Sequence, residues 1–152
     1  MNYYISILNN ENKMILIDFE KLIRKTEPEI WFKQFDEDYY REKLDKMDLD
    51  KKSNIIFCML DNQKVIARCD LIILESAMDF EKTGYIDWIY VEKTNRGNGF
   101  GKELINKVLE YLKDVGASYC YLFTAQNKEA QKFYIKQDYL EIDKKEVAYK
   151  FL

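Results

Sequence analysis

Hydrophobic residues make up 47% of the 152-residue chain and charged residues 34%, so we expect a single packed domain spanning residues 1–152. The net charge of −3 argues against nucleic-acid binding, because proteins that bind nucleic acids usually carry a basic face. The chain contains no histidine, which excludes Ser-His and Cys-His nucleophile pairs and His-rich zinc sites, and we expect no metal.

The first third of the chain is expected to form one strand followed by helices. Tyr3–Leu8 is rich in β-forming residues and predicts a strand. Met14–Lys25 favours a helix that ends before Pro28. Glu29–Met47 is also expected to be helical, with a possible break near Asp36. The acidic residues of this region fit a solvated face, with acceptor binding as the alternative; they are Asp36, Glu37, Asp38, Glu42, Asp45, Asp48 and Asp50.

The middle of the chain predicts three strands and a long helix. Asn54–Leu60 and Lys64–Leu74 have strong β patterns on either side of a short polar turn, which is typical of a hairpin. Gly84–Val91 is the next expected strand. An amphipathic helix should then run from about Gly99 to Val115, with its apolar residues on one face.

The last part of the chain predicts one strand, one short helix and a hairpin. Ser118–Thr124 is strand-like, and Asn127 can cap a short helix. Tyr139–Asp143 and Val147–Leu152 are expected to form a closing hairpin. The order of elements indicates a mixed α/β fold, with a single sheet flanked by helices.

The cysteines and the hydropathy pattern indicate the cellular location of the protein. Each of Cys58, Cys69 and Cys120 lies in a strand-like run, where a buried, reduced thiol is expected. No apolar run approaches the ~20 residues of a membrane span, and we see no signal-peptide pattern at the N-terminus. We therefore expect a cytoplasmic protein with no membrane partner.

A glycine-rich turn separates the strand ending at Val91 from the following helix. Its glycines stand at alternate positions, Gly97, Gly99 and Gly101. A strand, a glycine turn and a helix N-terminus together can hold a phosphate group. Gly101-Lys102 is followed by Glu103, where a P-loop requires Ser or Thr, and the third glycine of a dinucleotide fingerprint is replaced by Lys102.

Two motifs stand out in the second half of the chain. The first is Arg96-x-x-Gly99-x-Gly101. The second is Asn127–Tyr139, which is similar to the pattern N-x-x-A-x-x-F-Y-x-K-x-G-F, with Asp138 and Tyr139 in place of its last Gly and Phe. Both resemble motifs of the GNAT superfamily of acyl-CoA N-acyltransferases, and the resemblance covers about Asn54 to Leu152. It implies a mixed, mostly antiparallel sheet with splayed central parallel strands and about four helices.

The resemblance also implies acetyl-CoA as cosubstrate, with its pantetheine arm between the strand ending at Val91 and Ser118–Thr124. The diphosphate would rest on backbone N–H groups of the turn, and Asn127 would contact the pantetheine. The residues expected to bind the cosubstrate are Ile89, Tyr90, Val91, Arg96, Gly97, Asn98, Gly99, Phe100, Gly101, Lys102 and Asn127.

Transfer to an amine requires a neutral nucleophile and a stabilised leaving group. The resemblance implies that Tyr134 donates to the sulfur of the leaving thiolate. Tyr85 stands where many relatives carry a glutamate base, so Asp87, on the same strand face, and Glu75 are the candidate bases. Cys120 is expected to be a core residue, since these enzymes usually transfer the acyl group directly.

Three classes of function remain open from the sequence. The first is an N-acetyltransferase that acts on a primary amine in a ternary complex. The second is a non-catalytic acyl-CoA-binding module, and the third is a phosphate or nucleotide enzyme. An amine-bearing small molecule and a peptide N-terminus are both possible acceptors, and the protein can be a monomer or a homodimer. Glu27–Lys52 and Glu75–Thr83 are expected to frame the acceptor pocket.

Overall fold

The computed structural model describes residues 2–51, 53–137 and 140–151. The chain divides into two compact units, Met1–Leu122 and Phe123–Leu152.

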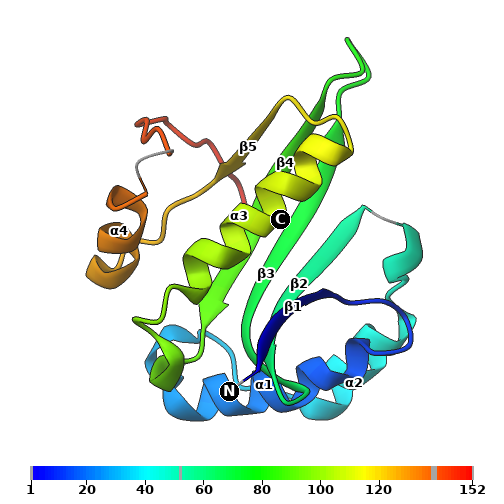
Figure 1. Ribbon diagram of the computed structural model, residues 1–152, viewed down its shortest axis with the longest axis vertical. Helices are drawn as coiled ribbons and strands as arrows, with labels where there is room; N and C mark the ends of the chain where they lie inside the picture. Colours follow the sequence, from blue (N-terminus) through cyan, green and yellow to red (C-terminus); the bar gives the residue numbers. More distant parts are fainter. Residues whose placement is uncertain (1, 52, 138–139, 152) are drawn as a thin grey trace. The chain divides into compact units, whose positions relative to one another are not determined.

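The first unit is built on a sheet whose strands follow the order of the chain (Figure 1). The described residues form the strands β1 (Tyr3–Ile7), β2 (Asn54–Asp61), β3 (Lys64–Glu75), β4 (Lys82–Val91) and β5 (Tyr119–Leu122). Neighbours from β1 to β4 are antiparallel, and β4 and β5 are parallel. The predicted mixed, mostly antiparallel sheet is confirmed.

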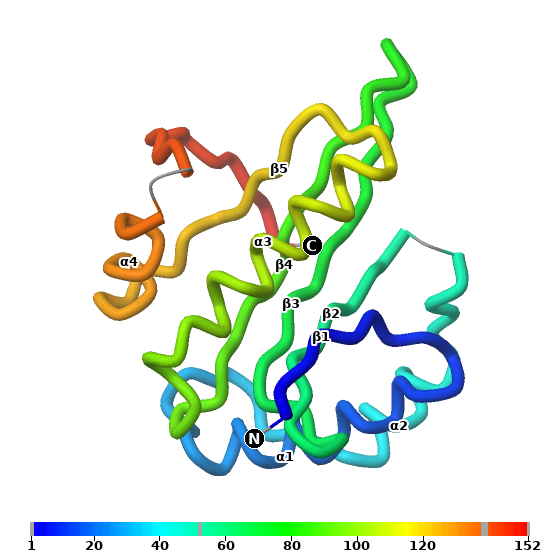
Figure 2. The backbone as a smooth tube through the Cα atoms, viewed as in Figure 1, coloured from blue at the N-terminus to red at the C-terminus, as the bar shows by residue number. Residues whose placement is uncertain are grey.

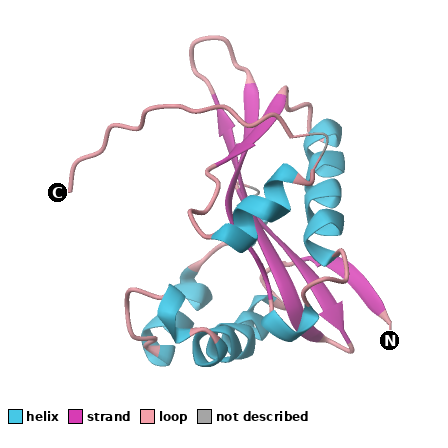
Figure 3. Cartoon of the chain, turned by 90° about the vertical axis from the view of Figure 1, so that its left-hand side faces the viewer, coloured by secondary structure: helices cyan, strands magenta, loops and turns pink. Residues whose placement is uncertain are grey.

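Helices cover both faces of this sheet. Figure 3 shows α3 (Phe100–Asp114) on one side, and α1 (Leu16–Thr26) and α2 (Glu37–Lys46) on the other. The apolar stripe of α3 packs on β2, β3 and β4, where the missing side chain of Gly84 leaves room for Leu112. The remaining α-helix of the described residues, α4 (Lys128–Ile135), lies in the second unit.

The helix predicted over Glu29–Met47 is shorter than expected. A short 3₁₀-helix, Pro28–Ile30, follows α1, and residues 31–36 are not helical. The break near Asp36 is confirmed, because the Asp36 carboxylate accepts a hydrogen bond from the amide of Tyr39 at 2.9 Å and caps α2.

The predicted closing hairpin is wrong for the residues that can be tested. Residues 140–151 are neither helix nor strand, while Tyr139 and Leu152 lie outside the described residues. Aromatic and β-branched residues favour strands only where a neighbouring strand pairs with them, and no ladder includes residues 140–151. In the described part of the chain, β5 is therefore an edge strand of the sheet, as β1 is on the opposite side.

The parallel pairing of β4 with β5 covers only the first half of β4. Their register runs from Thr83–Tyr119 to Ile86–Leu122, whereas β4 continues to Val91. Divergence between these two strands is the feature that the sequence resemblance implied. It leaves one edge of Asp87–Val91 without a strand partner among the described residues.

The turn between β4 and α3 has an unusual backbone. The chain passes from β4 through a short 3₁₀-helix, Lys93–Asn95, to the start of α3 (Figure 2). Gly97 and Gly99 both have a φ of +83°, which side chains rarely tolerate. Apart from the glycine itself and its two chain neighbours, no described residue has an atom within 4 Å of the position a Cβ would take at Gly97 or Gly99, so these glycines are required by conformation, not by crowding.

Replacement of Gly97 tests this origin. We expect Gly97→Ala to lower the free energy of unfolding by about 1 kcal/mol, because the left-handed conformation is costly for a residue with a Cβ. Gly97→Asn should cost clearly less, since asparagine is enriched at positive φ. Denaturant titration measures both variants. Equal losses for Ala and Asn, or no loss for Ala, would contradict this explanation.

Candidate functional site

A buried carboxylate fixes the beginning of the turn. Glu92, which is 3% exposed, accepts hydrogen bonds from the Thr94 amide at 3.1 Å and from Asn95 Nδ2 at 2.7 Å. The Thr94 hydroxyl donates to the same oxygen at 2.5 Å. Burial alone would raise the pKa of Glu92, but these hydrogen bonds outweigh it and hold the pKa below its usual value. The turn is thus organised by an ionised side chain beneath it.

The amides of residues 97–102 are available to a ligand. The first amide with an intrahelical partner is that of Glu103, which donates to the Gly99 carbonyl at 3.1 Å. In the described residues, the amides from Gly97 to Lys102 donate to no protein acceptor. They lie at the positive end of the α3 dipole, beside the open space over Gly97 and Gly99. This arrangement suits a phosphate or diphosphate group.

The residues at the start of α3 differ in burial and in their contacts. The buried Phe100 ring packs on Tyr3 with a centroid distance of 4.7 Å, so only the backbone of Phe100 can serve the turn. Gly101 is buried as well, whereas Lys102 is exposed. Asn98 Nδ2 donates to the Asn95 carbonyl at 3.0 Å and closes the turn.

The open edge of β4 presents a second set of backbone donors. The Glu92 amide donates to the Ile66 carbonyl of β3 at 2.9 Å. In an antiparallel ladder, alternate residues direct their N–H and C=O groups toward the same neighbour. The backbone of Tyr90 therefore faces β3, and the N–H groups of Ile89 and Val91 face the edge that β5 leaves open. An extended ligand can pair with this edge as a strand would.

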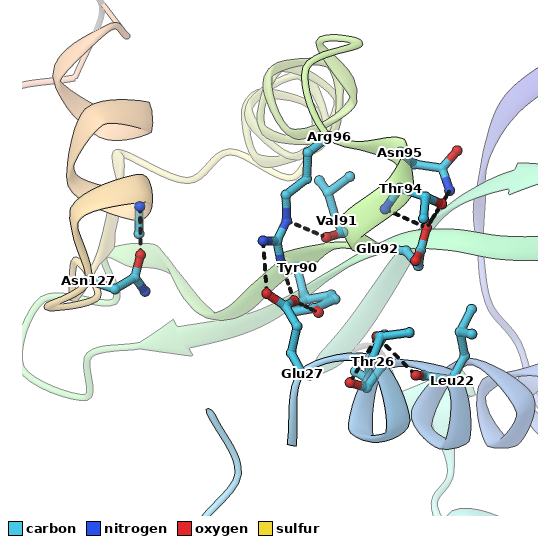
Figure 4. Close-up of polar contacts among 12 residues, drawn as sticks. Leu22, Thr26, Glu27, Tyr90, Val91, Glu92, Thr94, Asn95, Arg96 and Asn127 are labelled. Atoms are coloured by element: carbon cyan, nitrogen blue, oxygen red, sulfur yellow. Dashed lines mark hydrogen bonds and ion pairs between the residues drawn. The ribbon is translucent and has the colours of Figure 1, made fainter. Parts of the chain in front are cut away.

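Arg96 lies across this edge and is held by a residue that the sequence analysis missed (Figure 4). Its Nε donates to the Val91 carbonyl at 3.1 Å. Its Nη1 and Nη2 donate to the two carboxylate oxygens of Glu27 at 3.0 and 2.5 Å. Glu27 was predicted as part of a helix end and as the start of the segment that frames the acceptor pocket, but not as a partner of Arg96, because no local pattern links two residues 69 positions apart. The Arg96 side chain thus anchors the turn to α1.

Asp87 occupies a β-bulge. Asp70 lies opposite Trp88 and Leu71 opposite Ile86, which leaves Asp87 as the extra residue of β4. Asp87 is exposed, at the point where β4 loses its pairing with β5. Burial raises the pKa of Tyr85, and the nearby Asp87 carboxylate, which accepts a hydrogen bond from it, raises that pKa further. Asp87 was expected on the same strand face as Tyr85, and the two side chains are in contact.

Glu75, the other candidate base, stands elsewhere. It ends β3 and lies opposite Lys82, the first residue of β4. At about 3.3 Å per residue, Lys82 and Asp87 are separated by roughly 16 Å along the strand. The structure therefore does not bring Glu75 and Asp87 to one reacting centre. Cys120, expected in the core, packs against the cluster beneath α3, and burial raises the pKa of its thiol to about 11.

Asn127 and Tyr134 belong to the second unit. The Asn127 side chain accepts a hydrogen bond from the Ala130 amide at 2.8 Å, which confirms it as the N-cap of α4. Tyr134 is buried, and its ring contacts that of Phe133 with a centroid distance of 5.2 Å. Their roles toward a ligand stay predictions.

The described residues also limit two other kinds of site. They contain no group of three or more Cys, Asp or Glu side chains placed to hold a metal ion. Within the same residues, none of the helices has both the length and the apolar character needed to cross a membrane.

Solved structures share the fold at low sequence identity. An aminoglycoside acetyltransferase from an uncultured soil metagenomic sample, in complex with sisomicin, matches with a TM-score of 0.80 and 16% identity, over 99% of this chain and 96% of that chain. A ribosomal-protein-alanine N-acetyltransferase from Brucella melitensis biovar Abortus 2308 gives a TM-score of 0.76 and 18% identity, over 99% and 100%. Glucosamine-6-phosphate N-acetyltransferase from Arabidopsis thaliana gives 0.73 and 16%, over 98% and 99%.

A family model identifies the chain more directly. Comparison with curated proteins gives no match. The model of the acetyltransferase (GNAT) family, however, matches residues 17–139, which is most of the sequence. The chain therefore belongs to the acetyltransferase (GNAT) family, whose members use acetyl-CoA as cosubstrate.

Proposed function

We propose that the protein is an N-acetyltransferase that transfers the acetyl group of acetyl-CoA to a primary amine by direct attack in a ternary complex. The observation that carries this proposal is the run of unpartnered amides at residues 97–102 beside the open edge of β4. The family match supports the choice of cosubstrate. Because that match crosses the boundary between the two units, we also propose that residues 1–152 act as one catalytic domain.

Main-chain donors of the chain can be assigned to the diphosphate and to the pantetheine arm of acetyl-CoA. The amides of residues 97–102 would hold the diphosphate, and the N–H groups of Ile89 and Val91 would pair with the pantetheine arm. Acetyl-CoA supplies an acetyl group already activated as a thioester. A backbone N–H at Ile89 or Val91 could stabilise the negative charge that develops on the carbonyl oxygen during attack.

The acceptor amine must lose a proton before it attacks. An alkylamine with a pKa near 10.4 costs about 4–5 kcal/mol to deprotonate at pH 7. Asp87 is exposed beside the open edge of β4, and we propose that it accepts this proton directly or through water. Its negative charge would also attract a cationic amine.

The departing thiolate is the second charge to stabilise. A tyrosine hydroxyl has a reference pKa about 1.5 units above that of a thiol, so full proton transfer is uphill by roughly 2 kcal/mol. We propose that Tyr134 donates a hydrogen bond to this sulfur and that Asn127 contacts the pantetheine. The match of Asn127–Tyr134 to the second family motif supports both roles.

The acceptor is proposed only as a class. The structural relatives are named for aminoglycosides, for the alanine of a ribosomal protein and for glucosamine 6-phosphate. These compounds share an amine and little else. We therefore propose an amine-bearing small molecule or a peptide N-terminus as the acceptor.

Tyr134→Phe tests whether the protein is an enzyme. We expect acetyl-CoA consumption with a panel of amines in the wild type, and a kcat about 10²-fold lower in the variant with unchanged affinity for coenzyme A. Tyr149→Phe is a matched control, because Tyr149 lies in the same unit and is 80% exposed. If the wild type binds coenzyme A but acetylates no amine, the protein is a non-catalytic acyl-CoA-binding module.

The two candidate bases can be separated by isosteric replacement. We expect Asp87→Asn to lower kcat/KM for the amine by about 10²-fold at pH 7. The loss should shrink as the pH rises, because the amine then deprotonates without help. Glu75→Gln is the comparison, and the same loss should not occur there. A loss confined to the Glu75 variant would assign the base to Glu75 instead.

A further inference from the structure

A buried carboxylate joins the glycine turn to the other side of the molecule. Glu27, which is 7% exposed, is the C-cap residue that follows α1. It receives two hydrogen bonds from the Arg96 guanidinium and a third from the hydroxyl of Tyr90 (Figure 4). Arg96 in turn holds the Val91 carbonyl and lies over the Tyr90 ring, 5.2 Å from its centroid.

The contacts keep Glu27 ionised. Burial would raise the pKa of Glu27, but the hydrogen bonds from Arg96 and Tyr90, together with the charges of Arg96 and Lys93, hold it below the usual value. Loss of Arg96 would leave the Glu27 charge buried without a positive partner, which is far costlier than loss of an exposed pair. The ionised Glu27 carboxylate therefore links Arg96 and Tyr90 through hydrogen bonds.

The chain immediately after Glu27 packs on the face of β4 that points away from α3. The Trp31 ring lies 5.4 Å from the Trp88 ring and 6.2 Å from the Tyr90 ring, measured between centroids. The Arg24 guanidinium covers Trp31 at 4.4 Å. Tyr90 thus contacts Glu27 through its hydroxyl and Trp31 through its ring. It therefore belongs both to the polar contacts of Glu27 and to the aromatic cluster.

The cluster lies in the region that should receive the acceptor. Trp31 falls within Glu27–Lys52, the segment expected to frame the acceptor pocket. The Nε1 atom of Trp31 is buried and has no hydrogen-bond partner among the described residues. A shift of Trp31 would therefore change its packing against Trp88 and Tyr90 without breaking a hydrogen bond of its indole.

We propose that Glu27 is a positioning residue that couples the cosubstrate turn to the Trp31–Trp88 cluster. It holds Arg96, and through Arg96 the turn that presents the amides of residues 97–102. Binding of a diphosphate to the turn then shifts the cluster through Glu27 and Tyr90. Coupling between two sites is reciprocal, so a ligand packed against Trp31 also strengthens binding at the turn. The inference rests on the proposed use of coenzyme A.

The chain carries a built-in reporter for this coupling. It contains two tryptophans, Trp31 and Trp88, and both lie in the cluster. Intrinsic tryptophan fluorescence therefore reports on the surroundings of the Trp31–Trp88 cluster. Calorimetry with coenzyme A measures binding at the same time and does not depend on turnover.

Glu27→Gln is the decisive variant. We expect coenzyme A to change the tryptophan emission of the wild type. In Glu27→Gln the affinity for coenzyme A should fall about 10-fold, and the emission change at saturation should be lost. Tyr90→Phe removes one donor to Glu27 and keeps the ring, so it should give a smaller effect in the same direction.

Glu20→Gln is the matched control. Glu20 lies in α1, is 6% exposed and accepts hydrogen bonds from Arg68 at 2.8 Å and Arg24 at 3.2 Å. Its partners are these two arginines and not Arg96, so its replacement can change the baseline emission but should leave the effect of coenzyme A intact. The free energies of unfolding of all variants are measured alongside.

Each result bears on a different claim. If Glu27→Gln binds coenzyme A as tightly as Glu20→Gln and keeps the emission change, the role of Glu27 is overturned. If the wild type binds coenzyme A with no change in emission, the coupling is overturned while the proposed function stands. If the wild type does not bind coenzyme A at all, the proposed function itself fails, and this inference fails with it.

Discussion

The backbone amides of residues 97–102 have no acceptor in the described protein, and the structure around them serves to keep them so. Gly97 and Gly99, both in the left-handed conformation, set the path of the turn. Glu92 accepts a hydrogen bond from the turn, and the buried Phe100 fixes the first turn of α3 to the core. Unpaired amides at a helix N-terminus attract an anion without requiring a basic side chain. A protein with a net charge of −3 can therefore still hold a diphosphate.

The motif arginine illustrates how charge is used inside this fold. Arg96 stands in the signature that identifies the turn, yet its guanidinium pairs with Glu27 and with the Val91 carbonyl. Its positive charge is thereby neutralised within the protein by Glu27. Partial burial makes the attraction between these two charges stronger than it would be in water. The result is a turn tied both to its own strand and to the end of α1.

Much of this arrangement could be predicted from the sequence because its causes are local. Alternate glycines after a strand, an apolar stripe at helical spacing and Asn127 at a helix start each predict structure within a few residues. The Glu27–Arg96 pair could not be predicted, since it depends on the tertiary fold. The bulge at Asp87 is an extra residue opposite β3, and the sequence of β4 alone does not show where such a residue falls. The closing hairpin was wrong for residues 140–151, because β-forming residues alone do not supply a neighbouring strand.

The central claim is that coenzyme A binds to main-chain donors of the turn and of the open β4 edge. Residue-resolved amide hydrogen exchange, followed by NMR with and without saturating coenzyme A, tests it most directly. We expect coenzyme A to slow exchange at residues 97–102 and at Ile89 and Val91, while amides of α2 exchange at unchanged rates. Binding detected by calorimetry without any slowing at residues 97–102 would contradict the claim.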